Sequence, residues 1–155
     1  MKTNAARILD ALDIPYELRD YDPGDEHLTA AEVAERVSLP PEQVFKTLVV
    51  RGDKHGVAMA VIAATSELNP KALAKLTGDR KVEPVALKEV TPLTGYVRGG
   101  VTALACKKDY AVWVDETIAL HARIAVSAGV RGTQILLAPD DYLRATKGKI
   151  GAIAR

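Results

Sequence analysis

A lysine interrupts one of the most apolar stretches of the sequence, between Val44 and Val50. If this stretch is an extended strand, alternation places Lys46 on the same face as both valines and Leu48. An unpaired ammonium is costly to bury. Such a lysine therefore either lines a pocket for an anionic or polarised ligand or protects a strand edge from aggregation. The position alone leaves both interpretations open.

Two glycine-rich segments can bring backbone amides close to a ligand. Residues 95–100 end in the pair Gly99 and Gly100, and residues 127–132 begin at Ser127, directly after a predicted strand. Glycine permits close approach of the backbone and can aim N–H groups at negative charge. The first segment matches neither a Walker loop nor a dinucleotide-binding fingerprint. Both segments also fit ordinary tight turns, in which Ser127 caps a turn instead of binding a substrate.

The residues of several other catalytic chemistries are missing or scattered. The three histidines lie far apart in the sequence, no ligand pair has zinc-binding spacing, and no Gly-x-Ser-x-Gly elbow occurs. We therefore expect no metal ion and no cofactor, and we interpret each histidine as a surface or packing residue. Cys106 precedes Lys107 and Lys108, which can lower the pKa of its thiol, although a small residue that closes a strand fits the same pattern.

The composition is that of an ordinary globular protein. With 155 residues, 48% of them hydrophobic, the chain can form one sizeable core, so we expect a single domain over residues 1–155. A net charge of +1 argues against coating nucleic acid by bulk attraction, but the more basic C-terminal half is where a polyanion should bind. One cysteine, no signal-like N-terminus and no apolar run of membrane-spanning length predict a cytoplasmic protein without a membrane partner.

Helix and strand patterns are intermixed along the chain without strict β-α-β alternation. In the first half they predict a helix over 3–13 capped by Thr3 or Asn4, a strand over 16–21, a helix opened by a capping box of Thr29 and Glu32, and a hairpin of strands 44–50 and 57–63. In the second half they predict helices over 69–76 and 85–90, the latter stopped before Pro92, strands over 111–114, 123–127 and 134–137, and a last helix from Pro139. Together they predict an α+β domain with a curved, mostly antiparallel sheet flanked by helices.

Three segments taken together resemble the YbaK/EbsC family and the related prolyl-tRNA editing domain. Residues 44–48 are similar to the family's lysine-threonine strand, residues 94–100 to its glycine loop, and residues 126–132 to its late serine-glycine turn. The N-terminal helix, followed by residues 14–16 and Tyr21, is also similar to the family's opening. The resemblance covers nearly the whole chain.

The resemblance implies an aminoacyl-tRNA deacylase that removes cysteine misattached to proline-specific tRNA and acts beside prolyl-tRNA synthetase. A small apolar difference gives a synthetase only about 1–3 kcal/mol of discrimination, so a second check is needed. In the cysteine-specific members, the substrate's own thiol attacks its ester. The enzyme then supplies positioning rather than a nucleophile.

The same resemblance implies roles for particular residues. Lys46 would neutralise a phosphate of the terminal nucleotide or polarise the ester, and the amides of Gly99 and Gly100 would hold the terminal adenosine and stabilise the developing oxyanion. Substrate binding is expected from Tyr21, Thr47, Gly95, Ser127 and Gly129. Contacts with the phosphates of the tRNA acceptor stem are expected from Arg98, Lys107, Lys108 and Arg131.

Three departures from the family pattern bear on specificity. Residues 101–105 replace a serine-proline-x-glycine stretch, Ala128 replaces a common glycine, and Gln134 occupies a place where cysteine-specific members tend to have an aspartate. The alternatives are therefore a deacylase selective for alanine or serine and a catalytically silent binding module that keeps the pocket. Retention of Lys46 and both loop glycines favours catalysis.

Overall fold

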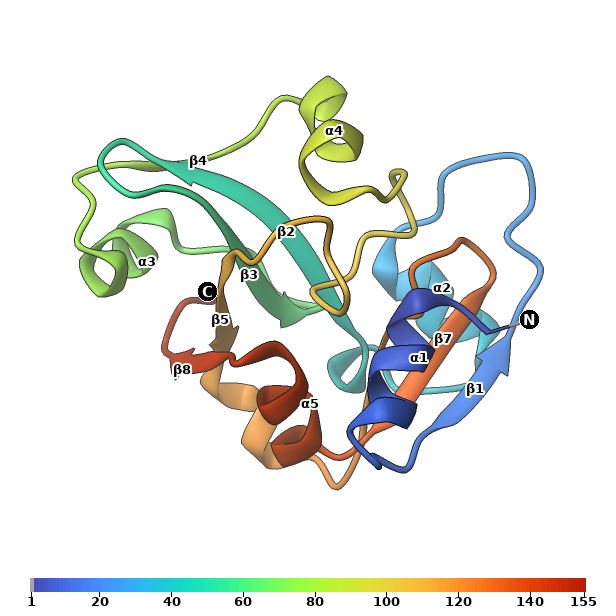
Figure 1. The fold of residues 1–155 in the computed structure, drawn as a ribbon. Coiled ribbons are helices and arrows are strands. Elements are labelled where there is room, and N and C mark those ends of the chain that lie inside the picture. The colour runs from blue at the N-terminus through green and yellow to red at the C-terminus, as the bar shows by residue number, and fades with distance from the viewer. Residues whose placement is uncertain (1) are drawn as a thin grey trace.

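The computed structural model, which describes residues 2–155, contains two β-sheets flanked by helices (Figure 1). The smaller sheet is antiparallel, in the order β1 (Glu17–Asp20), β7 (Thr133–Leu137) and β6 (Ile124–Ser127). The larger sheet has the order β4 (Val82–Pro84), β2 (Phe45–Gly52), β3 (Gly56–Ala63), β5 (Ala111–Asp115) and β8 (Lys149–Gly151). In the larger sheet, β3 with β5 and β5 with β8 are parallel pairs. The expected α+β class is confirmed, but the strands divide into two sheets instead of forming one.

Local sequence signals account for where most helices begin and end. The Thr3 side chain caps α1 (Asn4–Ala11), and Thr29 and Glu32 form the predicted capping box of α2 (Ala30–Arg36). In α3 (Pro70–Thr77), Gly78 ends the helix in the left-handed conformation. The last helix, α5 (Pro139–Thr146), begins at the predicted proline. Every helix among the described residues is too short or too polar to span a membrane.

The helix expected over residues 85–90 is the one element placed wrongly. A 3-10 turn, η2 (Leu87–Glu89), leads directly into α4 (Val90–Thr94), so the helical segment passes through Pro92. Proline is tolerated there because the first turn of a helix has no intrahelical partner for its N–H groups. Of two further 3-10 turns, η1 (Pro41–Gln43) connects α2 to β2, and η3 (Glu116–Leu120) connects β5 to β6.

Three apolar clusters hold these layers together. The largest lies between the two sheets and includes residues of both, such as Phe45 and Ile135, together with α1 and the buried Tyr142 of α5. A second cluster packs α3 on the outer face of the larger sheet, and a third packs α2 on the outer face of the smaller sheet. Val44 belongs to the third cluster and bridges to Ala125 of β6, so the two sheets meet at the start of β2.

Ala105 adopts a left-handed conformation that is unfavourable for a residue with a Cβ. Its φ angle is +54°, and the Tyr96 hydroxyl donates to the carbonyl oxygens of Leu104 and Ala105 at 2.6 and 3.0 Å, which holds the turn in place. The turn therefore keeps the backbone geometry of a glycine without the residue itself.

We expect Ala105→Gly to stabilise the protein by about 0.5–1 kcal/mol, because relief of the left-handed strain exceeds the entropy that glycine adds to the unfolded chain. Urea denaturation of the variant measures this change. Ala103→Gly is the matched control, since Ala103 is buried and not left-handed, and it should lower stability. Destabilisation by Ala105→Gly would mean that the turn does not carry this strain.

Candidate functional site

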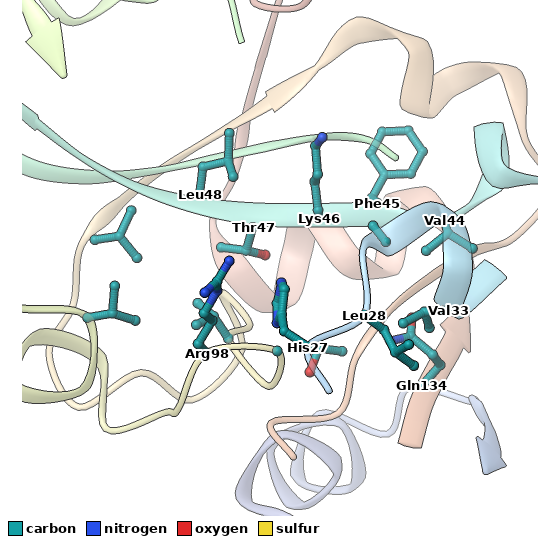
Figure 2. Close-up of a pocket in the computed structure, with 16 residues that line it drawn as sticks. His27, Leu28, Val33, Val44, Phe45, Lys46, Thr47, Leu48, Arg98 and Gln134 are labelled. Carbon is teal, nitrogen blue, oxygen red and sulfur yellow. The ribbon is translucent and has the colours of Figure 1, made fainter. Parts of the chain in front are cut away.

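A pocket of about 290 Å³ lies where the two sheets part (Figure 2). Its wall combines residues 27–33 at the start of α2, residues 44–49 of β2 and its approach, residues 90–101 from the start of α4 through the glycine segment, and the facing ends of β6 and β7. The predicted site residues that line it are Lys46, Thr47, Arg98, Gly99 and Ser127. This volume is near the lower end for small-molecule sites, which suits the end of a substrate better than a whole nucleic acid.

The pocket borders an open edge of β2. This strand pairs with β3 along its whole length but with β4 only from Val50 onward, so no strand formed by residues 2–155 covers its second edge over residues 45–48. Every residue from Val44 to Val49 lines the pocket. Backbone donors and acceptors along such an edge can bind polar groups of a ligand.

Lys46 lies on the face that alternation predicts. Val44 and Val50, on the same face, pack in the outer clusters beneath α2 and α3, and Lys46 lies between them, partly exposed at the pocket. Its ammonium forms no hydrogen bond and no ion pair with any residue in the range 2–155. In Figure 2 its side chain extends away from His27 and Arg98. The ammonium is therefore free to bind a ligand, and its catalytic role stays a prediction.

The two glycine segments pack directly against each other. A Cβ on Gly99 would lie 3.2 Å from Cγ of Arg131, and one on Gly100 would lie 3.1 Å from Cα of Val130. A Cβ on Gly129 would lie 2.8 Å from the Tyr96 ring. Gly99 and Gly129 also have φ angles of +87° and +95°, which favour glycine. These glycines allow both segments to form one wall of the pocket.

The guanidinium of Arg131 is bound to the protein itself. Its Nη2 donates to the carbonyl oxygens of Pro23, Gly24 and Glu26 at 3.0, 3.3 and 2.8 Å. These bonds hold the segment that carries His27 at the mouth of the pocket. The expected contact between Arg131 and tRNA stays a prediction, but the structure supports a role in positioning this segment.

The remaining predicted residues, like Gly100, Gly129 and Arg131, are not among those that line the pocket. Tyr21 donates its backbone N–H to the carbonyl of Gly132 at 2.9 Å, and Gly95 ends α4 in the left-handed conformation. Lys107 and Lys108 are exposed, and Lys108 lines a separate cavity that also contains Cys106. Their expected contacts with substrate or tRNA stay predictions.

The sequence interpretation missed His27, which lines the pocket beside Arg98. Partial burial lowers the pKa of its imidazole below the ordinary value, and the charges of Arg98 and Arg131 lower it further. His27 is therefore neutral at physiological pH and can donate or accept a hydrogen bond. No local signal in the sequence distinguishes it from a surface histidine, because the arginines that surround it are distant along the chain.

Thr47 and Tyr142 meet beneath the pocket. The Tyr142 hydroxyl is fully buried and lies close to the Thr47 side chain, although it makes no hydrogen bond of standard geometry within the described chain. Burial is the main cause that raises the pKa of Tyr142 far above its ordinary value. Thr47 therefore contacts the core on one side and the pocket on the other.

Cys106 is poorly suited to act as a nucleophile. Burial raises the pKa of its thiol to about 11, so it is protonated at neutral pH. Its Sγ lies 3.1 Å from the Thr102 carbonyl oxygen, and it does not line the pocket of Lys46. The residues between 2 and 155 also contain no cluster of three side chains that could hold a metal ion.

Cys106→Ser should therefore leave the activity proposed below nearly unchanged, because the Cys106 thiol is protonated and does not line the pocket. Measuring turnover together with the melting temperature checks this expectation. Loss of turnover in a variant that is still folded would identify Cys106 as a nucleophile.

Known proteins resemble this chain in sequence and in fold. The family model described as an aminoacyl-tRNA editing domain matches residues 25–145. A protein of Enterococcus faecalis, named as a candidate Cys-tRNA(Pro)/Cys-tRNA(Cys) deacylase, EbsC, is 40% identical over 152 residues, covering 98% of this chain and 93% of that protein.

Two solved structures share the fold. One is a hypothetical protein, 23% identical with a TM-score of 0.89, which covers 99% of this chain and 100% of its own. The other is named as a candidate trans-editing enzyme for prolyl tRNA synthetase; it is 20% identical with a TM-score of 0.84 and covers 100% of this chain and 99% of its own. At these identities the two structures establish the fold alone.

Proposed function

The chain belongs to the aminoacyl-tRNA editing domain family, and we propose that it hydrolyses the ester that joins misattached cysteine to proline-specific tRNA. The observation that carries this proposal is a pocket at an open edge of β2 that is lined both by Lys46, whose ammonium has no partner within residues 2–155, and by the backbone of Gly99. The name of the Enterococcus faecalis relative supports cysteine as the amino acid removed.

In this mechanism the protein positions a substrate that attacks itself. The thiol sulfur of the attached cysteine bonds to the ester carbonyl carbon, the C–O bond to the ribose breaks, and the ribose oxygen takes up a proton. Water then opens the resulting thiolactone to give free cysteine. Lys46 polarises the ester or neutralises a nearby phosphate, and the amide of Gly99, which lines the pocket, stabilises the oxyanion. The Gly100 N–H, expected to share this role, donates instead to the Val97 carbonyl oxygen at 2.9 Å. Ser127 orients the aminoacyl group.

The tRNA reaches this pocket from the side of the basic residues. Arg98 is exposed at the pocket, and Lys107 and Lys108 are exposed on the segment that follows the glycine wall. We place the reaction in the cytoplasm, where prolyl-tRNA synthetase releases mischarged tRNA, and we propose that synthetase as a partner.

Incubating the purified protein with Cys-tRNA(Pro) and with Cys-tRNA(Cys), each carrying labelled cysteine, tests the proposed function. We expect cysteine to be released from Cys-tRNA(Pro) far faster than in buffer. Release from Cys-tRNA(Cys) at the same rate would show that tRNA identity is not read. Tight binding without any release would instead establish a catalytically silent binding module.

A further inference from the structure

Gln134 breaks the apolar pattern of β7. Ile135 and Leu137 point into the core between the sheets, whereas Leu136, on the same face as Gln134, packs with Ala34 beneath α2. Gln134 is only 5% exposed, and the residues directly opposite it in the sheet, Arg19 of β1 and Ser127 of β6, are polar as well. A polar residue that breaks a local rule at the wall of a pocket is the kind of exception found at functional sites.

The side-chain oxygen of Gln134 lacks a donor. Oε1 is buried and has no hydrogen-bond partner among residues 2–155. Its cross-strand neighbour Ser127 also lines the pocket, but the Ser127 Oγ accepts from the Gly129 N–H at 3.1 Å. A buried acceptor without a donor destabilises the free protein, and a bound donor would remove that penalty. Oε1 has almost no solvent-accessible surface in the free protein, so a ligand donor reaches it when the Gln134 side chain turns toward the pocket that this residue lines.

The other polar groups of the pocket indicate which kind of ligand group would donate a hydrogen bond to Gln134. Lys46 and Arg98 bring positive charge, and no lining residue in the described chain is an aspartate or a glutamate. The only side-chain carbonyl among those lining residues is that of Gln134. In Figure 2 this side chain lies near Leu28 and Val33, apart from Arg98. A donor group of a ligand would therefore be placed at Gln134, and anionic groups at the cations.

We propose that the Gln134 carbonyl accepts a hydrogen bond from the α-amino group of the amino acid attached to tRNA, an inference that rests on the proposed function. Every aminoacyl ester carries this group, and it is the strongest donor that the aminoacyl part offers. Binding through the amino group leaves the cysteine thiol free to attack the ester. Gln134 thus recognises the part of the substrate that all amino acids share, through a neutral amide.

Gln134→Met tests this contact, because methionine has a similar length and no acceptor of comparable strength. Two probes that cannot be hydrolysed are titrated by calorimetry: adenosine carrying cysteine through a 3′-amide, and the same compound without the amino group. We expect the parent protein to bind the amino probe roughly 10-fold or more tightly. The variant should bind both probes equally. Its melting temperature without ligand should stay the same or rise, whereas loss of a purely structural glutamine would lower it.

Gln43→Met is the matched control, since Gln43 is the other glutamine of the chain and its amide donates to the Arg123 carbonyl at 2.9 Å, outside the pocket. This control should retain the preference for the amino probe. The inference is overturned if Gln134→Met retains the preference, or if the parent binds neither probe. The parent protein could prefer the amino probe through Gln134 and still fail to hydrolyse Cys-tRNA(Pro). That result would contradict the proposed function and leave this inference standing.

Discussion

Replacing Lys46 with alanine should slow the hydrolysis of Cys-tRNA(Pro) by roughly 100-fold or more, as expected when a group that stabilises transition-state charge is removed. The melting temperature should not fall, because the Lys46 ammonium has no ion pair or hydrogen bond to lose within residues 2–155. The face on which it lies is apolar at Val44 and Val50, and alanine is compatible with that face. Single-turnover release of labelled cysteine and thermal denaturation measure the two effects.

Lys54→Ala provides the control for this variant. Lys54 is exposed in the turn between β2 and β3, on the same hairpin but at its far end from the pocket. Its replacement should leave both the rate and the melting temperature close to those of the parent. If Lys46→Ala hydrolyses the substrate at the parent rate, Lys46 protects a strand edge and the site is wrongly assigned.

The second large effect concerns the substrate. If the attached cysteine attacks its own ester, Ala-tRNA(Pro) should be hydrolysed slower by orders of magnitude, although the smaller side chain fits the same pocket. The serine hydroxyl is a poorer nucleophile than the cysteine thiol at neutral pH. The hydrolysis rate of Ser-tRNA(Pro) should therefore fall between the rates of Cys-tRNA(Pro) and Ala-tRNA(Pro). Single-turnover rates for the three aminoacyl forms of one tRNA measure this order directly.

The structure supports this order, since the only cysteine of the protein lies away from the pocket with a raised thiol pKa of about 11. Ala-tRNA(Pro) hydrolysed as fast as Cys-tRNA(Pro) would rule out self-attack and favour the alternative of a deacylase that acts on alanine. Rates that are equal for serine and cysteine would place the nucleophile in the protein or in water.

Local signals allowed much of the fold to be predicted from the sequence. Helices begin after Thr3 and Thr29 and end at Gly78, each through contacts within a few residues. The hairpin of β2 and β3 follows from two apolar runs around one turn. The short strands β4 and β8 were not predicted, because three residues carry no periodic pattern and depend on neighbours far along the chain. The same dependence explains why two sheets, rather than one, could not be foreseen.

The candidate site divides in the same way. The face of Lys46 follows from alternation along one strand, which is why it could be predicted. Other features of the site join segments that are distant in sequence, so no local pattern predicts them. Gly99 packs on Arg131, that arginine anchors residues 23–26, and His27 lies near Arg98. The sequence accordingly predicts a tRNA contact for Arg131, which stays a prediction, but not the backbone carbonyls to which its guanidinium donates.

The central claim is that this pocket removes a wrong amino acid and spares the right one. Single-turnover hydrolysis of Cys-tRNA(Pro) and Pro-tRNA(Pro) under identical conditions, at protein in excess over tRNA, tests it most directly. We expect cysteine to be released rapidly while Pro-tRNA(Pro) decays at the rate seen in buffer alone, because proline has no thiol to attack its ester. Release of proline as fast as cysteine would contradict the account, and so would stability of both esters.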